Sequence, residues 1–488
     1  MKLKSLSCYS IMKMVFDINT LYEKNRVVYM RKILDKGFKP AIIELRKFKT
    51  DVEASGTKRH LVIAVERNNG YVYRTEFDVF APGVDDKRNN FIVERFIKSI
   101  LWLVGGYRIY IAGSHEVYEA IASYYTDGGL RDFDYHFMGR VYEHEVEVIE
   151  ATYETIPAEV KSSYKVGGHL DGRRIGFDAG GSDRKVSAVV NGESIYSEEV
   201  VWFPKLNSDP QYHYDGIYSA MKTAVEKMGG DVDAIGVSSA GVYIDNRAMV
   251  ASLFIKVAPA DFETRIKNIY LDVVKQLEGE LCHPIPVIVA NDGDVTALAG
   301  AMDLKDNGVL GIAMGTSEAV GYVDKDGNIT GWLNELAFVP ADFNKEAMVD
   351  EWSLDFGVGC KYFSQDAVIK LAPLAGIELD ENLSLAEKLK YVQKLNNEGH
   401  EGANQIFETI GVYLAYTLAF YAEFYDIKHV IILGRVTSGK GGDTILSVCK
   451  ETLAEVFPEY AHFNIEMPSE YLRRVGQSIA AASLSESL

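Results

Sequence analysis

Two kinds of hydrophobic pattern alternate along the chain. Short apolar runs, many rich in β-branched residues, predict strands at 61–65, 71–80, 108–112, 174–177, 186–190, 234–237, 285–290, 309–314, 320–323 and 430–433, and a further strand runs through Val201 after the turn at 192–193. Longer segments with apolar residues at helical spacing predict helices at 18–49, 91–104, 214–228 and 403–425. Because strands that alternate with helices are typical of an α/β architecture, we predict an α/β fold.

The order of the predicted elements is the same in two stretches of the chain. Residues 60–113 and 173–241 both run through strand, turn, strand, helix, Gly-Gly, strand and then small residues. One interpretation is a degenerate internal duplication. The other is that ββαβ order is common and arises without any duplication, and both interpretations stay open at this point.

Composition and charge exclude several classes of protein. The 488 residues are too many for one ordinary domain, and 47% of them are hydrophobic, which excludes dominant disorder. The formal charge of -19 argues against nucleic acid as the main partner, because phosphate binding needs a basic face. The charge is uneven: residues 1–60 hold 14 Lys and Arg against 6 Asp and Glu. That basic start is either an arm or a solvated helical face.

Cysteine usage and the start of the chain indicate a cytoplasmic protein. The four cysteines, Cys8, Cys282, Cys360 and Cys449, form no CxxC pair, so neither a disulfide framework nor a Cys-rich metal site is expected. Residues 11–16 are mostly apolar, but Lys13 interrupts them, and we expect no signal peptide. The longest apolar stretch, 97–113, contains charges and two central glycines, so no membrane span is expected.

Two Gly-rich hairpins are candidates for holding phosphate. In the first, an apolar strand ends at Asp178, and Gly180, Gly181 and Ser182 follow. Glycines let a backbone approach phosphate oxygens, and an acid at a strand end suits a hydrated Mg²⁺. The second hairpin has the same order, with Gly315-Thr316 after a strand. Each could equally be a plain Gly-rich turn.

A third Gly-rich loop follows the predicted strand 430–433. Gly434, Gly439 and Lys440 fit most of the GxxxxGK[ST] pattern, but Gly441 stands where the pattern needs Ser or Thr. We therefore do not identify a P-loop. A strand that runs into a Gly-rich loop and then a helix, from about Asp443, still favours a nucleotide at the strand end.

A fourth motif places an acid where it could act as a base. The strand 285–290 leads into Asn291-Asp292 and then a small-residue helix. A carboxylate there could accept a proton from a substrate hydroxyl, with Asn291 orienting the same substrate. The alternative is that Asn291 or Asp292 caps the following helix.

The order of these four motifs resembles the sugar-kinase, actin and Hsp70 superfamily of ribonuclease H-like ATPases. Within it, residues 173–485 are most similar to the ROK family of sugar kinases and sugar-responsive repressors. The resemblance implies duplicated ribonuclease H-like domains that flank a nucleotide cleft, with ATP and Mg²⁺ as cofactors. It implies Asp292 as the catalytic base and Asp178 as the acid that meets Mg²⁺ through water. The implied phosphate and nucleotide contacts are Gly180, Gly181, Ser182, Gly315, Thr316, Gly434, Ser438 and Gly439, with Arg435 where a second Gly is usual.

The sugar side departs from the family pattern. In the family's Glu-x-Gly-His motif, Glu335 is retained and Phe338 stands at the His position. Of the family's zinc-binding Cys cluster, only Cys360 is present, and a single thiolate cannot build a four-ligand site, so we expect no structural zinc. Tyr362 stands where the family has another sugar-binding Glu. The resemblance therefore implies Asn291 and Glu335 as the remaining sugar contacts.

The boundaries follow from the irregular, Gly-rich stretch before residue 173. We predict a basic helical leader at 1–59, an extra N-terminal α/β domain at 60–150 that could be a degenerate ribonuclease H-like copy, a linker at 151–172, and kinase-like lobes at 173–290 and 291–488.

Two functions stay open. One is ATP-dependent phosphorylation of a sugar hydroxyl; the other is a degraded kinase that senses a ligand without turnover. ROK repressors carry an N-terminal winged helix, and residues 25–37 resemble its first helix, but no recognition helix follows. We therefore expect sugar and ATP as partners, no nucleic acid and no membrane, and we leave self-association into a homo-oligomer open.

Overall fold

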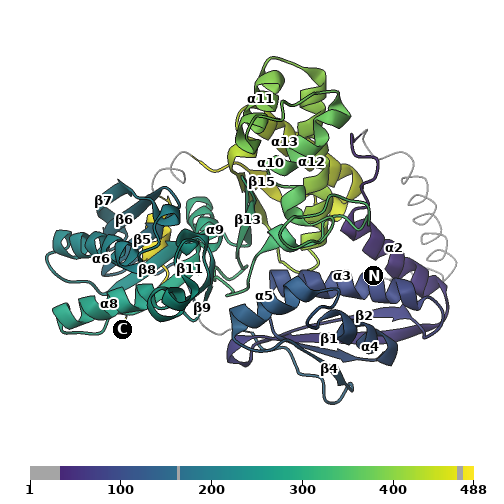
Figure 1. The fold of residues 1–488 in the computed structure, drawn as a ribbon, viewed down its shortest axis with the longest axis horizontal. Helices are drawn as coiled ribbons and strands as arrows, with labels where there is room; N and C mark the ends of the chain where they lie inside the picture. Colours follow the sequence, from purple (N-terminus) through teal and green to yellow (C-terminus); the bar gives the residue numbers. More distant parts are fainter. Residues whose placement is uncertain (1–32, 162–164, 470–475, 488) are drawn as a thin grey trace, which may run out of the picture.

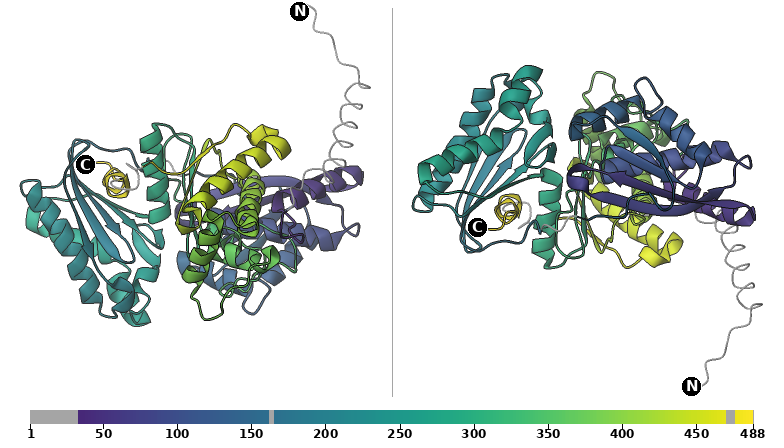
Figure 2. Two further views of the ribbon diagram at one scale, coloured as in Figure 1. Left: turned by 90° about the horizontal axis from the view of Figure 1, so that it is seen from above. Right: turned by 90° about the horizontal axis from the view of Figure 1, so that it is seen from below.

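The computed structural model describes residues 33–161, 165–469 and 476–487 (Figure 1). They form one five-stranded sheet, two four-stranded sheets and a two-stranded ribbon, with helices packed around them (Figures 1 and 2). The predicted α/β fold is confirmed. No helix in these three ranges is long and apolar enough to cross a membrane.

Lobe 1 is built on the five-stranded sheet. Its strands are β5 (Arg173–Ala179), β6 (Asp183–Val190), β7 (Glu193–Val201), β8 (Ala234–Ser239) and β11 (Val287–Asn291), in the order β11-β8-β5-β6-β7. β5, β6 and β7 form an antiparallel meander, while β8 and β11 run parallel to β5. This is the ribonuclease H-like arrangement. Its helices include α6 (Pro210–Lys227) and α8 (Ile269–Leu281), and the ribbon is β9 (Val242–Ile244) with β10 (Arg247–Val250).

Lobe 2 has a four-stranded sheet with a related order. Its strands are β12 (Val309–Met314), β13 (Glu318–Val323), β14 (His429–Leu433) and β15 (Asn464–Glu466), in the order β13-β12-β14-β15. β13 is antiparallel to β12, as β6 is to β5 in lobe 1. β12, β14 and β15 are parallel, as β5, β8 and β11 are. The helices are α9 (Asp292–Leu304), α10 (Gln365–Leu371), α11 (Leu385–Asn397), α12 (Glu401–Tyr421) and α13 (Lys440–Val456).

The N-terminal sheet differs from lobe 1 in its strand pairing. It holds β1 (Lys58–Glu66), β2 (Val72–Phe80), β3 (Arg108–Ala112) and β4 (Glu147–Ala151), with helices α3 (Asp86–Leu103), α4 (His115–Tyr124) and α5 (Asp132–Tyr142). β3 pairs antiparallel with β1, whereas the corresponding β8 pairs parallel with β5. The expectation of a degenerate ribonuclease H-like copy is therefore wrong: lobe 1 has the extra strand β7 between its hairpin and α6, and without such a strand the chain enters β3 in the opposite direction relative to β1.

The chain returns to lobe 1 at its C-terminal end, which corrects the predicted boundary of 291–488 for lobe 2. Helix α14 (Gln477–Ala482) packs on β5 and β8 (Figure 1). The approach is close: a Cβ on Gly176 would lie 1.7 Å from the carbonyl oxygen of Ser478, and one on Gly236 would lie 1.7 Å from that of Ala481. Only glycine fits at both positions, so these two strands are built to receive α14.

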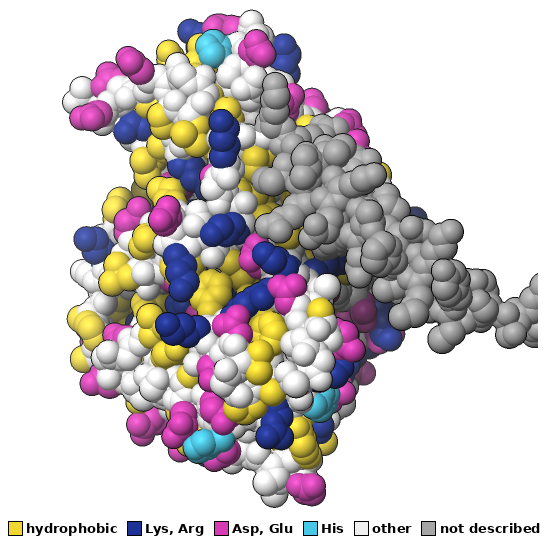
Figure 3. Space-filling view, turned by 90° about the vertical axis from the view of Figure 1, so that its right-hand side faces the viewer, with side chains coloured by type: hydrophobic (Ala, Val, Ile, Leu, Met, Phe, Trp, Pro, Cys, Tyr) yellow, Lys and Arg dark blue, Asp and Glu magenta, His cyan; other side chains and the backbone are white. Residues whose placement is uncertain are grey.

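The described part of the basic leader is packed on the body of the protein. Residues 1–32 lie outside the described residues, and with them most of the helix predicted at 18–49 and of the winged-helix resemblance at 25–37. Helix α2 (Ala41–Ala54) begins only after Pro40, because a residue before proline avoids the helical conformation. Its basic side chains pair with acids: Arg46 with Glu459 and Lys49 with Glu423. Acidic and basic side chains are interspersed on this face (Figure 3).

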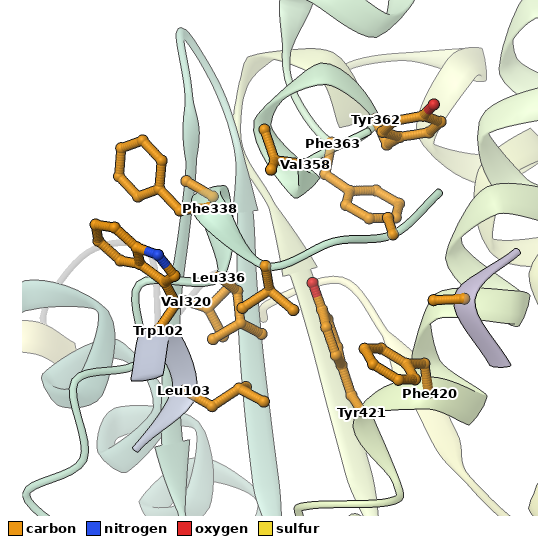
Figure 4. Close-up of a cluster of buried hydrophobic side chains, with 14 of the residues drawn as sticks. Trp102, Leu103, Val320, Leu336, Phe338, Val358, Tyr362, Phe363, Phe420 and Tyr421 are labelled. Carbon is orange, nitrogen blue, oxygen red and sulfur yellow. The ribbon is translucent and has the colours of Figure 1, made fainter. Parts of the chain in front are cut away.

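The N-terminal domain and lobe 2 share one hydrophobic core. Buried residues of β1, α3 and α5 belong to the same cluster as buried residues of β12, β13, α12 and α13. Phe96 of α3 stacks on Phe424 with ring centroids 5.1 Å apart, and Trp102 lies 4.3 Å from Phe338 (Figure 4). The extra domain is therefore an integral part of the lobe 2 half of the molecule.

Candidate active site

Three parallel strands of lobe 1 end at one edge of the sheet. Asp178 of β5 lies in register with Ser238 of β8, and Ser239 of β8 lies in register with Asn291 of β11. Asp292 follows directly and opens α9. Since ligands of open α/β sheets bind beyond the carboxyl ends of the strands, this edge is the candidate site.

Asp178 is a buried carboxyl with a hydroxyl partner. The Ser238 hydroxyl donates a hydrogen bond of 2.8 Å to Oδ1 of Asp178. Burial raises the pKa of Asp178 to about 6; the bond from Ser238 opposes that rise, and the nearby charge of Asp292 adds to it. The charge of Lys185, in register with Asp178 on β6, also opposes the rise, but among the described residues no cation forms an ion pair with Asp178, so its carboxylate would gain from a bound cation.

The first Gly-rich turn is shorter than predicted, with only residues 180–182 between β5 and β6. Trp202 holds it from both sides: its indole N–H donates to the carbonyl of Gly180 at 2.8 Å, and its backbone N–H donates to that of Ser182 at 3.1 Å. Lys205 lies over the turn, with Cε 3.2 Å from where a Cβ on Gly181 would be. The turn therefore carries a lysine directly beside its glycines.

Asn291 caps α9 with its side chain. Its Oδ1 accepts from the backbone N–H of Gly293 at 2.7 Å, and its Nδ2 donates to the carbonyl of Gly241 at 2.7 Å. Both polar ends are used inside the protein, which favours the capping interpretation. The role of Asn291 as a sugar contact stays a prediction.

The start of α9 touches the second lobe. A Cβ on Gly321 of β13 would lie 2.0 Å from the backbone of Gly293. Asp292 therefore lies at the edge of the lobe 1 sheet and close to the lobe 2 sheet. Figure 1 shows α9 between the two lobes. Burial raises the pKa of Asp292, against the backbone N–H groups at the start of the helix and the charge of Lys205.

Two further acidic positions lie near Asp292, one in α9 and one in a loop of lobe 2. Asp294, in the first turn of α9, is buried, and its Oδ1 accepts from the backbone N–H of Tyr322 at 3.1 Å and from the amide of Asn334 at 2.8 Å. The next residue, Glu335, is half-buried. Burial raises the pKa of Asp294 and of Glu335 to about 7 each; the charge of Asp292 adds to both rises. We call Asp178, Asp292, Asp294 and Glu335 the site carboxyls.

The predicted nucleotide contacts of lobe 2 lie at neighbouring strand ends. Gly315 and Thr316 follow β12, and Gly434 follows β14, which is parallel and paired to β12. Gly434 approaches the Met314 backbone so closely that a Cβ would lie 2.4 Å from its carbonyl oxygen. Ser438 is exposed just before α13, and Gly439 stands at the N-cap position of that helix.

A cavity of about 490 Å³ opens beside the start of α13. Its walls include Asn396, Asn404, Lys440 and Asp443, which come from α11, α12 and α13. Lys440 donates to the carbonyl of Asn397 at 2.9 Å. The side chains in its lining can donate and accept hydrogen bonds.

The residues that depart from the family pattern serve the core. Phe338 is buried against Trp102. The hydroxyl of Tyr362 donates to Oδ2 of Asp342 at 2.6 Å, and Lys370 lies 3.4 Å above the Tyr362 ring. Cys360 is also buried, and burial raises the pKa of its thiol. All three side chains belong to the buried hydrophobic cluster of this half of the molecule.

Metal ligation in the candidate site would be indirect. Among the residues that the structure describes, the one group of three or more potential ligands with atoms within 4.8 Å of one another is Asp127, Asp132 and His136, all exposed in the N-terminal domain. The site carboxyls are not gathered in that way. They fit Mg²⁺, which keeps most of its waters and is held through one or two carboxylates and the substrate phosphates.

Sequence reasoning missed four residues of the site: Ser238, Asp294, Trp202 and Lys205. A signal existed for Ser238, because it directly follows the predicted strand 234–237, as Asp178 follows the predicted strand 174–177. Asp294 lies only two residues after Asp292, in the first turn of the helix. An acid at such a position is usually interpreted as an exposed residue that stabilises the helix dipole. Trp202 and Lys205 gave no signal, since their contacts with residues 180–182 depend on how the chain folds back after β7.

No family model matches the chain, and no curated protein matches it. Solved structures do. A ROK hexokinase from Thermus thermophilus has 14% identity and a TM-score of 0.48, over 64% of this chain and 97% of that one. A ROK-family glucokinase from Streptomyces griseus, in complex with glucose and AMPPNP, has 19% identity and a TM-score of 0.43, over 64% and 99%. A ROK-family transcriptional regulator, a homologue of the E. coli MLC protein, has 13% identity and a TM-score of 0.45, over 64% and 79%.

Proposed function

We propose that this chain transfers the γ-phosphoryl group of ATP to a hydroxyl of a sugar or sugar derivative. The observation that carries the proposal is that Asp178 and Asp292 stand at the carboxyl ends of parallel strands, with Asp294 and Glu335 beside Asp292, between two lobes that each present a Gly-rich hairpin. Phosphoryl transfer is catalysed mainly by positioning and by charge neutralisation, and both need this arrangement. ROK-family kinases and a ROK-family regulator are among the similar solved structures.

Asp292 is the proposed general base. In the in-line step a bond forms between the acceptor oxygen and the γ-phosphorus, the bond from that phosphorus to the bridging oxygen breaks, and ADP leaves with the electron pair. The acceptor proton passes to Asp292. The raised pKa of Asp292 strengthens it as a base, and the charge of Lys205 favours its ionised form.

Asp178 is the proposed acid on the metal side. Mg²⁺, bound with ATP, supplies charge neutralisation at the phosphates. Asp178 would accept from one of the metal's waters, with Ser238 holding its carboxylate in place at 2.8 Å. The turns at 180–182 and 315–316 and the loop at 434–439 are the proposed contacts for the phosphates and the nucleoside.

Glu335 is the proposed contact for the acceptor. It is half-buried beside Asp292, and its backbone N–H is fixed by the carbonyl of Trp102 at 2.9 Å. A carboxylate accepts from sugar hydroxyls, and both of its oxygens can take part. Since a hexokinase and a glucokinase are among the similar structures, hexoses are the first acceptors to test.

The test is ADP formation with Mg-ATP and a panel of glucose, mannose, fructose, N-acetylglucosamine and N-acetylmannosamine. We expect one acceptor to stimulate ADP formation and Asp292→Asn to lower kcat by about 10³-fold or more, because removal of a positioned base costs 10²–10⁴-fold. Asp303→Asn is the matched control, since it makes the same change at an exposed position of the same helix. Wild-type rates in Asp292→Asn would exclude this residue as the base.

The second candidate is a ligand sensor without turnover, and the side chains of Phe338 and Tyr362 favour it. Both stand where the family has sugar or zinc ligands, and both are buried in the core. If Mg-ATP and a sugar raise the melting temperature while no sugar stimulates ADP formation, the sensor replaces the kinase.

A further inference from the structure

The loop that carries Glu335 is attached to the N-terminal domain through its backbone. The N–H groups of Leu333, Asn334 and Glu335 donate to three successive carbonyls at the end of α3, those of Val104, Leu103 and Trp102, at 3.3, 2.9 and 2.9 Å. The last carbonyls of a helix have no partner within the helix, so they are free to accept these bonds. The C-terminal end of α3 therefore holds the backbone of residues 333–335 in place.

Side chains reinforce the same attachment. The Trp102 ring lies 4.3 Å from that of Phe338, and Leu103 and Leu336 belong to the same buried cluster (Figure 4). The indole N–H of Trp102 donates to Oδ1 of Asp134 at 2.5 Å, which ties the end of α3 to α5. Residues 333–338, which we call the Glu335 loop, therefore pack on the junction of α3 and α5 in the N-terminal domain.

Residues 355 and 356 of lobe 2 are also attached to the N-terminal domain, in this case by charged side chains. Asp355 of lobe 2 is buried and meets three cations of the N-terminal domain: Arg95 at 2.9 Å, Arg131 at 3.0 Å and Lys98 at 3.4 Å. Arg95 also donates to the carbonyl of Phe356 at 2.9 Å. Glu94 and Asp134 complete the cluster, as partners of Arg131 at 2.5 Å and of Lys98 at 2.7 Å.

From the opposite side, α9 holds the same loop. The amide of Asn334 donates to Asp294 at 2.8 Å, and its Oδ1 accepts from the hydroxyl of Tyr425 at 2.8 Å. Asn334 itself has a positive φ of 52°, a conformation that needs support from its surroundings. Glu335 is therefore fixed between α3 of the N-terminal domain and α9, the helix that carries Asp292.

We propose that the N-terminal domain is a positioning element of the site: the end of α3, with the buried ion cluster around Asp355, holds Glu335 at the distance from Asp292 that the acceptor requires. This inference rests on the proposed function for the identity of the acceptor, a sugar hydroxyl. Trp102 and Arg95 are positioning residues, because both lie on α3 and act on the acceptor only through the end of that helix and the residues 333–338 that it holds. A displacement of about 1 Å at such a loop lowers turnover by up to about 100-fold.

Two variants test the attachment at its two ends. Trp102→Leu removes the ring under Phe338, and Arg95→Lys keeps the charge but loses the paired bonds to Asp355 and the bond to the Phe356 carbonyl. Arg88→Lys is the matched control: it makes the same change on the same helix, where Arg88 pairs with Asp51 at the surface. Arg95→Lys is the milder change and keeps the test valid if Trp102→Leu does not fold.

Hydrogen exchange of the ligand-free protein is the direct readout. We expect the amides of residues 333–335 to exchange at least 10-fold faster in Trp102→Leu and in Arg95→Lys than in the wild type and in Arg88→Lys. We also expect kcat/KM for the best acceptor of the panel to fall about 10- to 100-fold, with KM for ATP within twofold.

Each result decides a different point. Unchanged exchange at residues 333–335 in both variants overturns the attachment. Faster exchange with unchanged kcat/KM for the acceptor overturns the positioning role. If no sugar of the panel is phosphorylated by the wild type, the proposed function fails, while the exchange rates still decide whether α3 holds the Glu335 loop.

Discussion

The molecule contains two groups of acids at buried or half-buried positions, and their surroundings shift the pKa values in opposite directions. Asp355, with Glu94 and Asp134, shares its site with Arg95, Lys98 and Arg131. Burial alone would raise the pKa of Asp355, but Lys98, Arg95 and Arg131 hold it well below its usual range. Among the described residues no cation forms an ion pair with a site carboxyl: the charges of Lys185 and Lys205 act on Asp178 and Asp292 more weakly, and the pKa values of all four carboxyls are raised.

This difference separates structure from function. Three acids with three cations in contact neutralise one another and join two domains, so no further ion is needed there. Buried acids without cations lower the stability of the ligand-free protein, and clusters of that kind are typical of sites that bind a metal, a charged substrate or a proton. The second group is therefore where Mg-ATP and an acceptor are expected.

Removing one acid from each group should change stability with opposite sign. Asp355→Asn leaves three buried cations with two acids, and we expect it to lower the free energy of unfolding by about 3–5 kcal/mol. Asp178→Asn removes a charge that burial disfavours, so we expect it to raise the free energy of unfolding by roughly 1–2 kcal/mol at pH 8. Urea unfolding of both variants checks this. Equal destabilisation by both would remove the distinction between the groups.

The second expectation concerns pH. The folded-state pKa of about 7 for Asp294 is above its ordinary value, so its folded form holds the proton more tightly than its unfolded form. The resulting stabilisation is fully present near pH 4 and is lost as pH rises through 7. We expect the ligand-free protein to lose stability between pH 5 and 8, and Asp294→Asn to reduce that loss by on the order of 2 kcal/mol. A slope as steep in the variant as in the wild type would contradict this origin.

The smallest effect is expected for an acid that is paired but exposed. Glu143 of the N-terminal domain meets Arg247 at 2.9 Å and Lys267 at 2.5 Å, both in lobe 1, and its side chain is 40% exposed. We expect Glu143→Gln to lower the free energy of unfolding by at most about 1 kcal/mol, and less at high salt. Urea midpoints at low and high salt measure this, and a loss as large as that of Asp355→Asn would show that burial is not what sets the scale.

The sheet of lobe 1 and its two leading acids could be predicted from the sequence. β5, β8 and β11 are apolar runs bounded by polar or small residues, and Asp178 and Asp292 stand where those runs end. Local pattern is enough in this case, because the end of a buried strand is visible in the sequence and parallel strands bring their ends together.

The different pairing of β3 and β8 follows from one extra strand. Lobe 1 has β7 between its hairpin and α6, whereas β2 leads directly into α3, so β8 enters its sheet parallel to β5 and β3 enters its sheet antiparallel to β1. The sequence pattern could not show which distant element covers each sheet, such as lobe 2 against α3 or α14 on β5 and β8.

The sequence alone also could not decide the role of side chains that fit two functions equally well. Asn291 fits both a cap and a substrate contact, and only the fold shows that its two polar ends are already used. Phe338 and Tyr362 stood at family ligand positions, and only the packing of α3 and of residues 33–40 against lobe 2 shows that they belong to the core.

The most direct test is phosphorus-31 NMR of Mg-ATP with the acceptor that best stimulates ADP formation. Loss of ATP by itself does not distinguish transfer to a sugar from transfer to water, whereas a sugar phosphate ester gives its own resonance. We predict that this resonance grows with the wild type and with Asp303→Asn, and is absent with Asp292→Asn although that variant still binds Mg-ATP. Inorganic phosphate as the sole product, or an ester formed at the wild-type rate by Asp292→Asn, would contradict the proposed phosphoryl transfer through Asp292.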